Sequence, residues 1–434
     1  MNAAHNSWNP DGPRILCISP DFAPKRDSEA FCATKFINAL TECGAQITAI
    51  VYAKPEMDID RSEIWNSVRA TVLRIPPPEK RNPFVSLANA VRYKTWFWAR
   101  WTSEAVRQAR LFHRNSPFDV VYSRSLPMFG HIAGYWCAKE LNLPWIANLN
   151  DPWDFHQFPV GIFFEGRTWT EVGLSDFWMR KTLRYADLVT YPSDRLRRYQ
   201  STLSKIPHES QIIPHVGNSQ FFGGASESNG NMANFHLVHA GKLGTNEMTG
   251  RSAAALLDGL RLFLNDCEDA RDLTRLTLVG PEDRATQAHI RRLGLEATVV
   301  SVGRTDYEES LKYIKSATAC LLVEAEMPEG IFLPSKLVDY ISARKPVLAL
   351  SPRVGVVADL ASGGGIARVD PGDACGIQEA IRGLYMDFRK GNLAQRSPSS
   401  LQVDQFRPEL IANRFLGFLR DLIVAKKEGK LRRA

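Results

Sequence analysis

The sequence predicts an α/β protein with two Rossmann-like, doubly wound domains that face a central cleft. Three observations support this prediction: the length of 434 residues, the alternation of short apolar strands with helical stretches, and a polar segment near the middle. A chain of 434 residues is too long for one ordinary core, so two domains of roughly 200 residues are expected. Continuous apolar strands separated by helices are typical of parallel sheets covered on both faces.

Each half of the chain contains six short runs of apolar and β-branched residues. In the first half we expect strands at 14–19, 45–52, 70–75, 119–124, 145–150 and 188–193. In the second half we expect strands at 235–241, 274–280, 298–303, 318–325, 346–351 and 365–370. Between the first two strands, "FCATKFINALTECG" (31–44) has helical periodicity and ends at a glycine, which is typical of a helix terminus.

The segment "GGASESNGNMAN" (223–234) is rich in Gly, Ser and Asn and predicts a linker or hinge surface. We therefore expect an N-terminal domain over 1–218 and a C-terminal domain over 219–404. Ligands of doubly wound sheets bind beyond the carboxyl ends of the strands. With two such sheets facing each other, the site is expected in the cleft between the domains.

Composition limits the classes of protein that remain. Hydrophobic residues make up 44% and charged residues 23%, as in globular proteins, and no run of 18 apolar residues predicts a membrane span. The N-terminus lacks the pattern of a secretory signal. Seven scattered cysteines without CxxC spacing favour a reducing cytoplasm over a disulfide framework or zinc site. The net charge of +7 fits an acidic small molecule, an anionic membrane or nucleic acid, without choosing among them.

The segment "GIFLPSKLVDYISARKPVLAL" (330–350) combines a loop, a short helix and a strand. A helix N-terminus attracts phosphate, Gly330 permits close backbone approach, and Ser335 is a suitable N-cap. Lys336 would add positive charge, and Asp339 could accept hydrogen bonds from the hydroxyls of a ribose. These features fit the diphosphate and ribose of a sugar nucleotide. An acidic residue near a helix start and a surface lysine are also common without any ligand, and that alternative stays open.

A second loop with basic residues follows the expected strand 235–241. It begins with Gly241 and Lys242 and reaches Arg251 where a helix begins. Because this loop and the 330–350 segment both follow strands, they should line the same crevice. The alternative for Lys242 is a solvated surface position.

Several segments in order resemble bacterial GT-B glycosyltransferases of the retaining family four (group 1 type). These are "ILCISPDFAPKRDSEAFCATKFINALTECGAQITAI", "FDVVYSRSLPMFGHIAGYWCAKELNLPWIANLNDPW", "ADLVTYPSDRL" with "IIPHVGN", "HAGKLGTNEMTGRSAAALLDGL", "LTLVGP", "VSVGRTDYEESLKYIKSATACLLV", the 330–350 segment and "GGGIARVDPGD". The resemblance covers roughly residues 14 to 425. It implies a final helix, within 405–434, that returns to the first domain.

The resemblance also implies donor-binding roles. Lys242 matches the first basic residue that holds the diphosphate, and Arg251 is the expected second, displaced by an insertion. The family has two glutamates eight positions apart, of which the second binds ribose, and Asp339 occupies that second place. The first would fall on Ile331, so Glu329 can serve only with a two-residue adjustment of the loop. The sequence therefore departs from the family's best-known motif.

On the acceptor side, the family often has a His-Asp pair after a strand of the first domain. Asn150 and Asp151 stand there in this chain, so the imidazole is missing and Asp151 is the expected acceptor contact. The alternative is an Asp-Pro turn that only ends the strand. The family's glycine pair in the first loop is replaced by Ser28 and Glu29.

The implied function is a hexosyltransferase that uses a nucleotide-sugar donor, retains anomeric configuration and builds bacterial cell-surface polysaccharide. We expect a glycan or lipid-linked acceptor, no metal or other cofactor, and no nucleic acid. The departing diphosphate would be stabilised by Arg251, Lys242 and helix-terminus amides. Two alternatives stay open: a nucleotide-sugar epimerase of similar fold, and a non-catalytic binding or assembly protein.

We expect a cytoplasmic location, with peripheral attachment to the inner face of the membrane as an open alternative. The aromatic and basic segment 91–114 fits either an anionic membrane surface or a helix packed on the sheet. The apolar "FPVGIFF" (158–164) and the basic tail 425–434 favour the membrane. The "DID" at 58–60 resembles a metal-binding pair, but we expect a polar loop there.

Overall fold

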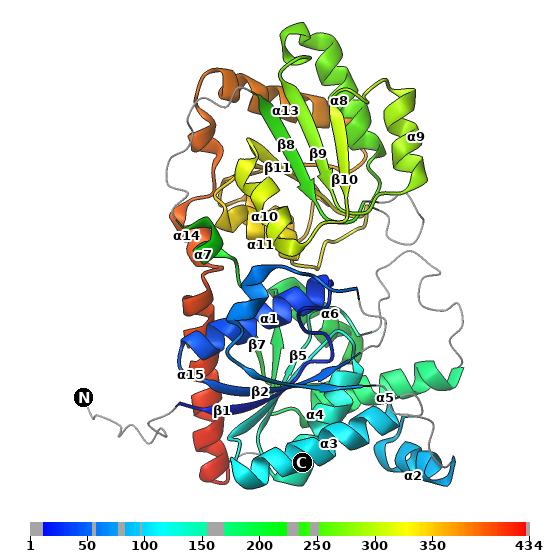
Figure 1. Cartoon of the computed structure of the whole chain (residues 1–434), viewed down its shortest axis with the longest axis vertical. Helices are drawn as coiled ribbons and strands as arrows, with labels where there is room; N and C mark the ends of the chain where they lie inside the picture. Colours follow the sequence, from blue (N-terminus) through cyan, green and yellow to red (C-terminus); the bar gives the residue numbers. More distant parts are fainter. Residues whose placement is uncertain are drawn as a thin grey trace, which may run out of the picture. The chain divides into compact units, whose positions relative to one another are not determined.

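The computed structural model describes residues 12–53, 58–76, 83–95, 98–153, 169–223, 234–243 and 251–430. The chain divides into two compact units, and each has its own sheet (Figure 1). The first unit holds the described residues up to Pro214 together with the C-terminal segment from Pro408. The second unit holds the described residues of His215–Arg407.

The first unit contains a seven-stranded parallel sheet in the order β3-β2-β1-β4-β5-β6-β7 among the described residues. Its strands are β1 Arg14–Ile18, β2 Gln46–Tyr52, β3 Thr71–Ile75, β4 Val120–Arg124, β5 Trp145–Asn148, β6 Leu188–Tyr191 and β7 Ser210–Ile212. Its helices are α1 Ser28–Glu42, η1 Glu63–Ser67, α2 Pro83–Tyr93, α3 Ala99–Asn115, α4 Phe129–Leu141, α5 Trp169–Tyr185, α6 Asp194–Ser204 and α15 Pro408–Lys427.

The second unit contains a six-stranded parallel sheet in the order β10-β9-β8-β11-β12-β13, within the same described ranges. Its strands are β8 Phe235–Ala240, β9 Thr274–Val279, β10 Val299–Gly303, β11 Ala319–Val323, β12 Val347–Leu350 and β13 Ile366–Val369. Its helices are α7 Ser219–Phe222, α8 Ala254–Asp266, η2 Glu268–Ala270, α9 Arg284–Arg292, α10 Tyr307–Ser316, α11 Ser335–Ser342, α12 Val356–Ala361, α13 Ala374–Arg389, η3 Leu393–Arg396 and α14 Ser400–Asp404.

The prediction of two Rossmann-like domains is confirmed, and each expected strand overlaps an observed one. Strand β7 was not predicted, because it has three residues and lacks a continuous apolar run. The expected helix at 31–44 is α1, which begins three residues earlier because Asp27 caps it by accepting from the Glu29 amide at 2.9 Å. The expected linker at 223–234 lies, apart from its two end residues, outside the described residues.

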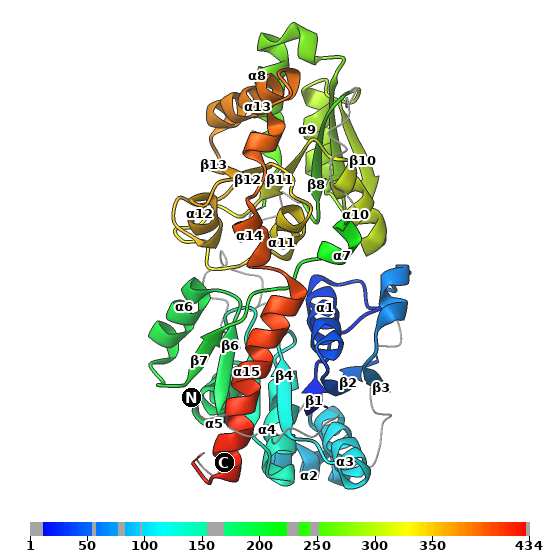
Figure 2. The same cartoon turned by 90° about the vertical axis from the view of Figure 1, so that its left-hand side faces the viewer.

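The final helix α15 belongs to the core of the first unit, as the resemblance implied. The Phe415 ring is fully buried, with its centroid 5.2 Å from that of Phe36 in α1 and 5.0 Å from that of Tyr122 in β4. Figure 2 shows α15 running along the strands of this unit. The last helix therefore covers part of one face of the first sheet, although the chain reaches it only after completing the second unit.

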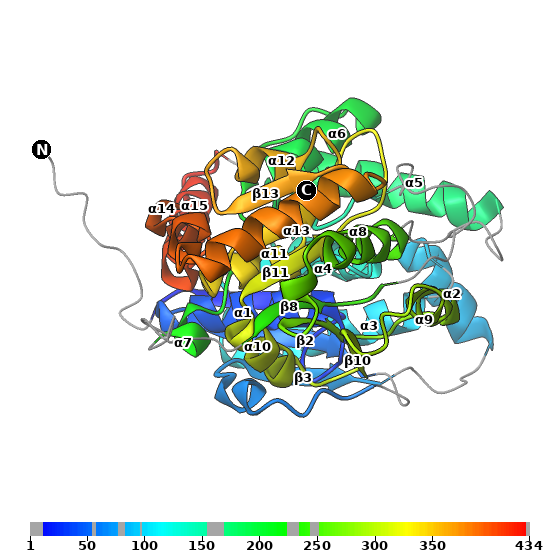
Figure 3. The same cartoon turned by 90° about the horizontal axis from the view of Figure 1, so that it is seen from above.

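In the second unit, α8 and α13 lie side by side over the sheet (Figure 3). Gly259 of α8 permits this close approach, since a Cβ there would lie 2.7 Å from Cγ2 of Ile377 in α13. Both helices contribute buried apolar side chains to the core, which also includes Phe235 and Leu321 from the sheet. Hydrophobic burial therefore holds this helix pair on the sheet. Polar residues lie instead at the carboxyl ends of the strands.

The aromatic segment 91–114 is not one helix: α2 ends at Tyr93 and α3 begins at Ala99. Trp101 is 1% exposed, and the Trp98 ring stacks on Phe129 with centroids 3.6 Å apart. The alternative of core packing is therefore confirmed for these two rings, while residues 96–97 and 158–164 lie outside the described ranges. Across the part of the chain that the structure describes, none of the helices has the length and apolar character needed to cross a membrane.

Candidate active site

A tyrosine from α11 connects the carboxyl end of β8 with the neighbouring strand β11 in the second unit. The hydroxyl of Tyr340 accepts from the Ala240 amide at 2.8 Å and lies 3.2 Å from the Leu321 carbonyl oxygen. The Nδ1 atom of His239 lies 3.0 Å from that same carbonyl oxygen. His239 is fully buried. These contacts hold α11 against the end of β8 and the middle of β11.

Lys336, in the first turn of α11, extends along the end of β8. A Cβ on Gly241 would lie 2.4 Å from Nζ of Lys336 and 2.9 Å from its Cε, so the lysine side chain passes directly over this glycine. Gly241 has φ +130, and a Cβ on Gly280, after β9, would lie 2.4 Å from the Gly241 carbonyl oxygen. Glycine is required at both positions because neither the backbone conformation nor the space suits a side chain.

The Nζ atom of Lys336 is shielded from solvent and has no hydrogen-bond partner among the described residues. Burial, and then the positive charge of Arg251, lower the pKa of Lys336 to about 7. Burial also raises the pKa of Glu324, the residue after β11, to about 7. Within the described ranges no ion pair joins Lys336 to Glu324, although each acts electrostatically on the other. A buried ammonium without a partner favours binding of an anion.

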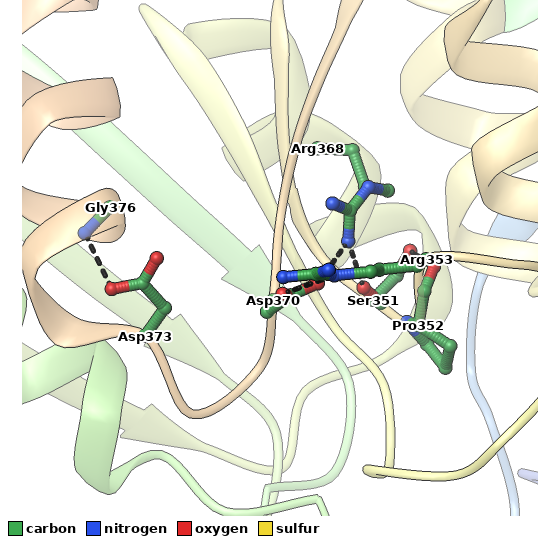
Figure 4. A network of polar contacts seen from close by, with 7 residues as sticks. All are labelled: Ser351, Pro352, Arg353, Arg368, Asp370, Asp373 and Gly376. Atoms are coloured by element: carbon green, nitrogen blue, oxygen red, sulfur yellow. Dashed lines mark hydrogen bonds and ion pairs between the residues drawn. The ribbon is translucent and has the colours of Figure 1, made fainter.

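The residues after β12 and β13 extend this polar edge (Figure 4). Ser351, after β12, makes a side-chain hydrogen bond with Glu324. Arg368 donates from Nη1 to the Ser351 carbonyl oxygen at 2.8 Å and to Oδ1 of Asp370 at 2.6 Å. Arg353 donates from Nε to Oδ2 of Asp370 at 2.8 Å, and the two guanidinium groups lower the pKa of Asp370. Three successive strand ends thus carry connected polar groups.

The structure changes one expectation for the 330–350 segment. The N-cap of α11 is Pro334, so the prediction that Ser335 caps the helix is wrong: Ser335 is the first helical residue, and no side chain caps α11. Its first-turn amides are therefore not occupied by a capping side chain. Gly330 pairs with Gly355 in a parallel bridge, with its amide 2.9 Å from the Val354 carbonyl oxygen.

Asp339 lies one turn beyond Lys336 and is 4% exposed. Its Oδ2 accepts from the hydroxyl of Tyr307 in α10 at 2.8 Å, and that hydroxyl also accepts from Nδ2 of Asn218 at 3.3 Å. Its predicted role toward a ribose stays a prediction. Lys242 is exposed and Glu329 is half-buried beside Gly330. The structure thus places Lys336 over Gly241, where the charge of Arg251 acts on it. Asp339 is buried in the second unit.

In the first unit, polar residues gather at the carboxyl ends of β1, β4 and β5. Asn150, after β5, donates from Nδ2 to Oε2 of Glu29 at 2.7 Å and to the Ser125 carbonyl oxygen at 3.1 Å. Burial, and then the charge of Asp151, raise the pKa of Glu29 to about 8, while Arg124 opposes the shift. Asp151, the predicted acceptor-contacting residue, is therefore close enough to Glu29 for its charge to act on the Glu29 carboxyl.

Comparison with known proteins relates this arrangement to a family of enzymes. Residues 30–214 match the model of the glycosyl transferase 4-like domain. These residues are similar to that family, and the whole chain has the GT-B fold. No curated protein matches this chain in sequence.

Three solved structures share the fold of this chain. Sucrose-phosphate synthase from Thermosynechococcus elongatus has a TM-score of 0.66 and 16% identity, with 95% of this chain and 100% of that chain covered. Anabaena HepE in complex with UDP and glucose has a TM-score of 0.63 and 15% identity, with coverage of 94% and 99%. A putative UDP-N-acetylglucosamine 2-epimerase from Listeria monocytogenes has a TM-score of 0.53 and 11% identity, with coverage of 97% and 98%.

Three residues that contact or surround these groups were not among the predicted site residues. Glu324 was included in an apolar strand, yet a carboxylate directly after "ACLLV" was a usable signal because strand ends carry ligand contacts. Glu29 was noted only as the replacement of a glycine. Tyr307 gave no signal, since its contact with Asp339 joins residues from two helices that are distant in the sequence.

Proposed function

We propose that this protein is a glycosyltransferase, which transfers a sugar from a nucleotide-sugar donor whose diphosphate binds at Lys336 in the second unit. The observation that carries the proposal is the shielded Nζ of Lys336, which has no hydrogen-bond partner in the described ranges and lies over Gly241 at the end of β8. A diphosphate placed there would meet this ammonium, the charge of Arg251 and the uncapped first-turn amides of α11. The UDP in the HepE structure, a protein of the same fold, supports this choice of ligand class.

The same groups suit the chemistry of transfer. When the bond between the anomeric carbon and the diphosphate oxygen breaks, negative charge develops on the leaving diphosphate. Lys336, Arg251 and Lys242 would stabilise that charge, so we propose that these side chains take the role that a metal ion has in other glycosyltransferases. The acceptor hydroxyl forms the new bond to the anomeric carbon, and its proton passes to a diphosphate oxygen. This route needs no protein nucleophile and gives retention of configuration.

We propose that the acceptor binds to the first unit, at Glu29, Asn150 and Asp151. Two carboxyl groups and an amide can accept and donate hydrogen bonds to sugar hydroxyls. Burial and the charge of Asp151 raise the pKa of Glu29 to about 8, so this carboxyl is largely protonated at neutral pH and can also donate. We therefore propose a glycan or lipid-linked acceptor, in the synthesis of a bacterial cell-surface polysaccharide on the cytoplasmic side of the membrane.

Incubation with UDP-, GDP-, ADP- and TDP-sugars tests the proposal. The protein should release the nucleoside diphosphate from one of them, and the release should increase when a glycan or lipid-linked acceptor is added. Conversion of the sugar without acceptor and without diphosphate release would instead indicate an epimerase. Failure to bind any of the four classes in a thermal-shift screen would refute the proposed donor site.

A further inference from the structure

Helix α2 of the first unit presents its apolar residues to solvent. The exposed fractions of its large apolar side chains are high: Phe84 79%, Val85 51%, Leu87 50% and Val91 69%. Phe84, Leu87 and Val91 are spaced by three and four residues, so they form one stripe along the helix. Side chains this exposed make little contribution to folding, because the hydrophobic effect acts on the area removed from water.

The opposite face of α2 packs against the first unit and includes polar side chains. Ser86 and Asn89 are half-buried, and Ser86 accepts from Nε of Arg100 in α3 at 3.1 Å. Ala90 and Tyr93 complete this face and are buried. An ordinary surface helix turns its apolar stripe inward and its polar residues outward. In α2 the large apolar residues Leu87 and Val91 instead point away from the unit.

Three lysines gather beside the C-terminal end of α2. Lys94 follows the helix directly, and its carbonyl oxygen accepts from Nε1 of Trp178 in α5 at 2.8 Å. Lys139 of α4 and Lys94 each act on Lys181 of α5, whose pKa is lowered by burial and then by these two like charges. Figure 1 shows α2 at one end of the first unit with α3 and α5 nearby.

None of these three lysines forms an ion pair with a carboxylate among the described residues. The nearby Glu140 of α4 is occupied by Arg92, at 2.8 Å, and by Arg110. Asp176 of α5 pairs with Arg180 at 2.8 Å. Like charges that converge without a counter-ion repel one another, so an anion with several charged groups would relieve that repulsion.

Aromatic rings lie beneath the three ammonium groups. Nζ of Lys181 is 4.3 Å from the ring centroid of Tyr135, and Nζ of Lys94 is 5.2 Å from that of Phe177. Nζ of Lys139 is 5.6 Å from the ring centroid of Trp136. Cation–π contacts hold the charges at the surface without neutralising them.

We propose that α2 and the lysine cluster (Lys94, Lys139 and Lys181) dock this unit on a bilayer of anionic phospholipids. The exposed stripe of α2 inserts among the acyl chains, and the lysine cluster binds the phosphate headgroups beside it. An acidic protein would match the lysines but would leave the apolar stripe in water. An anionic bilayer satisfies both features, because its charged and apolar layers are adjacent.

Co-sedimentation of the full chain with phosphatidylcholine vesicles, with and without phosphatidylglycerol, tests this proposal. We expect binding to the anionic vesicles at low salt and little binding to phosphatidylcholine alone. The triple variant K94Q/K139Q/K181Q should bind roughly 100-fold more weakly, since each basic residue near an anionic surface contributes a factor of about five. The double variant L87S/V91S should also lose binding.

Two control variants separate docking from general effects of charge and surface polarity. The triple variant K312Q/K315Q/K390Q removes the same charge from the second unit, and L401S/V354S replaces two exposed apolar residues there. Both controls should bind as the natural chain does. The proposal would be overturned if the control variants lost binding to the same extent, or if the natural chain bound neutral vesicles equally well. It would also be overturned if the natural chain did not bind vesicles and L87S/V91S changed the oligomeric state measured by light scattering. Donor and acceptor are absent from the assay, so its outcome is independent of the proposed transfer reaction.

Discussion

Lys336 and Gly241 lie so close that a Cβ on the glycine would be 2.4 Å from the lysine Nζ. The contact joins the first turn of α11 to the end of β8, two elements about a hundred residues apart. It holds a positive charge at the strand ends while shielding that charge from water. An arrangement of this kind is unfavourable for the folded protein alone and becomes favourable when an anion binds.

The variant Gly241→Ala should weaken nucleotide diphosphate binding by at least about tenfold, because the added methyl group displaces Lys336. The variant Gly294→Ala is the matched control, since Gly294 also has a left-handed φ, of +63, but a Cβ there meets nothing within 4 Å. Both variants should lose about 1 kcal/mol of stability from the backbone conformation. Calorimetric titration with each nucleoside diphosphate measures the difference, and equal affinities in the two variants would contradict the role of this contact.

Replacing Lys336 by methionine should raise the free energy of unfolding by about 1–3 kcal/mol, because it removes a buried, unpaired ammonium. The pKa of Lys336 in the folded protein is about 7, below that of an exposed lysine. The unfolded chain therefore binds the proton more tightly, and the stability gain should be full below pH 7 and vanish near pH 10.5. Denaturant unfolding across this range, with the exposed Lys390→Met as control, measures the gain. A destabilised K336M at pH 6 would refute the assignment.

Affinity for a nucleoside diphosphate should fall as the pH rises above 7. The charged form of Lys336 binds the anion, and burial beside Arg251 holds the pKa of Lys336 at about 7 in the free protein. Above that pH, binding must take up a proton, so affinity should decrease by up to about tenfold per pH unit. Calorimetry in buffers of different ionisation enthalpy detects this uptake. The K336M variant should show a flatter profile, governed by Glu324, and an unchanged profile would exclude Lys336 as the titrating group.

The variant Arg251→Ala should reduce the rate of sugar transfer by several tens-fold or more, since a cation at a leaving group contributes about 2–4 kcal/mol to transition-state stabilisation. Arg291→Ala, at an exposed position of α9 in the same unit, serves as control. Steady-state measurement of diphosphate release compares the two. Near-normal turnover in R251A would remove Arg251 from the proposed mechanism.

The variant Phe415→Ala should lower the free energy of unfolding by about 3–5 kcal/mol, because it empties a fully buried site between α1 and β4. Leu410→Ala, in the same helix but 47% exposed, should change stability by less than about 0.5 kcal/mol. Thermal unfolding of the two variants tests whether α15 is an integral part of the first unit. Similar melting temperatures would contradict that conclusion.

The sequence by itself determined the two sheets and their strands, because the strands are continuous apolar runs and burial of such runs is a local, readable signal. It also marked Gly241 at the end of a strand, and Lys336 and Arg251 near the starts of two helices. The short β7 escaped because three residues carry too little pattern. The cap of α11 was misplaced by one residue, since Pro334 and Ser335 are both acceptable at a helix start.

Only the tertiary structure decided which of these residues meet. It placed Lys336 over Gly241 and Asp339 in hydrogen-bond contact with Tyr307. It also placed Glu324 where the charges of Lys336 and Arg251 act on it. It also buried Trp101 while leaving Leu87 and Val91 in water, although all three lie in the same aromatic and apolar region. The physical reason is that desolvation and pairing depend on neighbours supplied by distant parts of the chain, which spacing along one strand or helix does not specify.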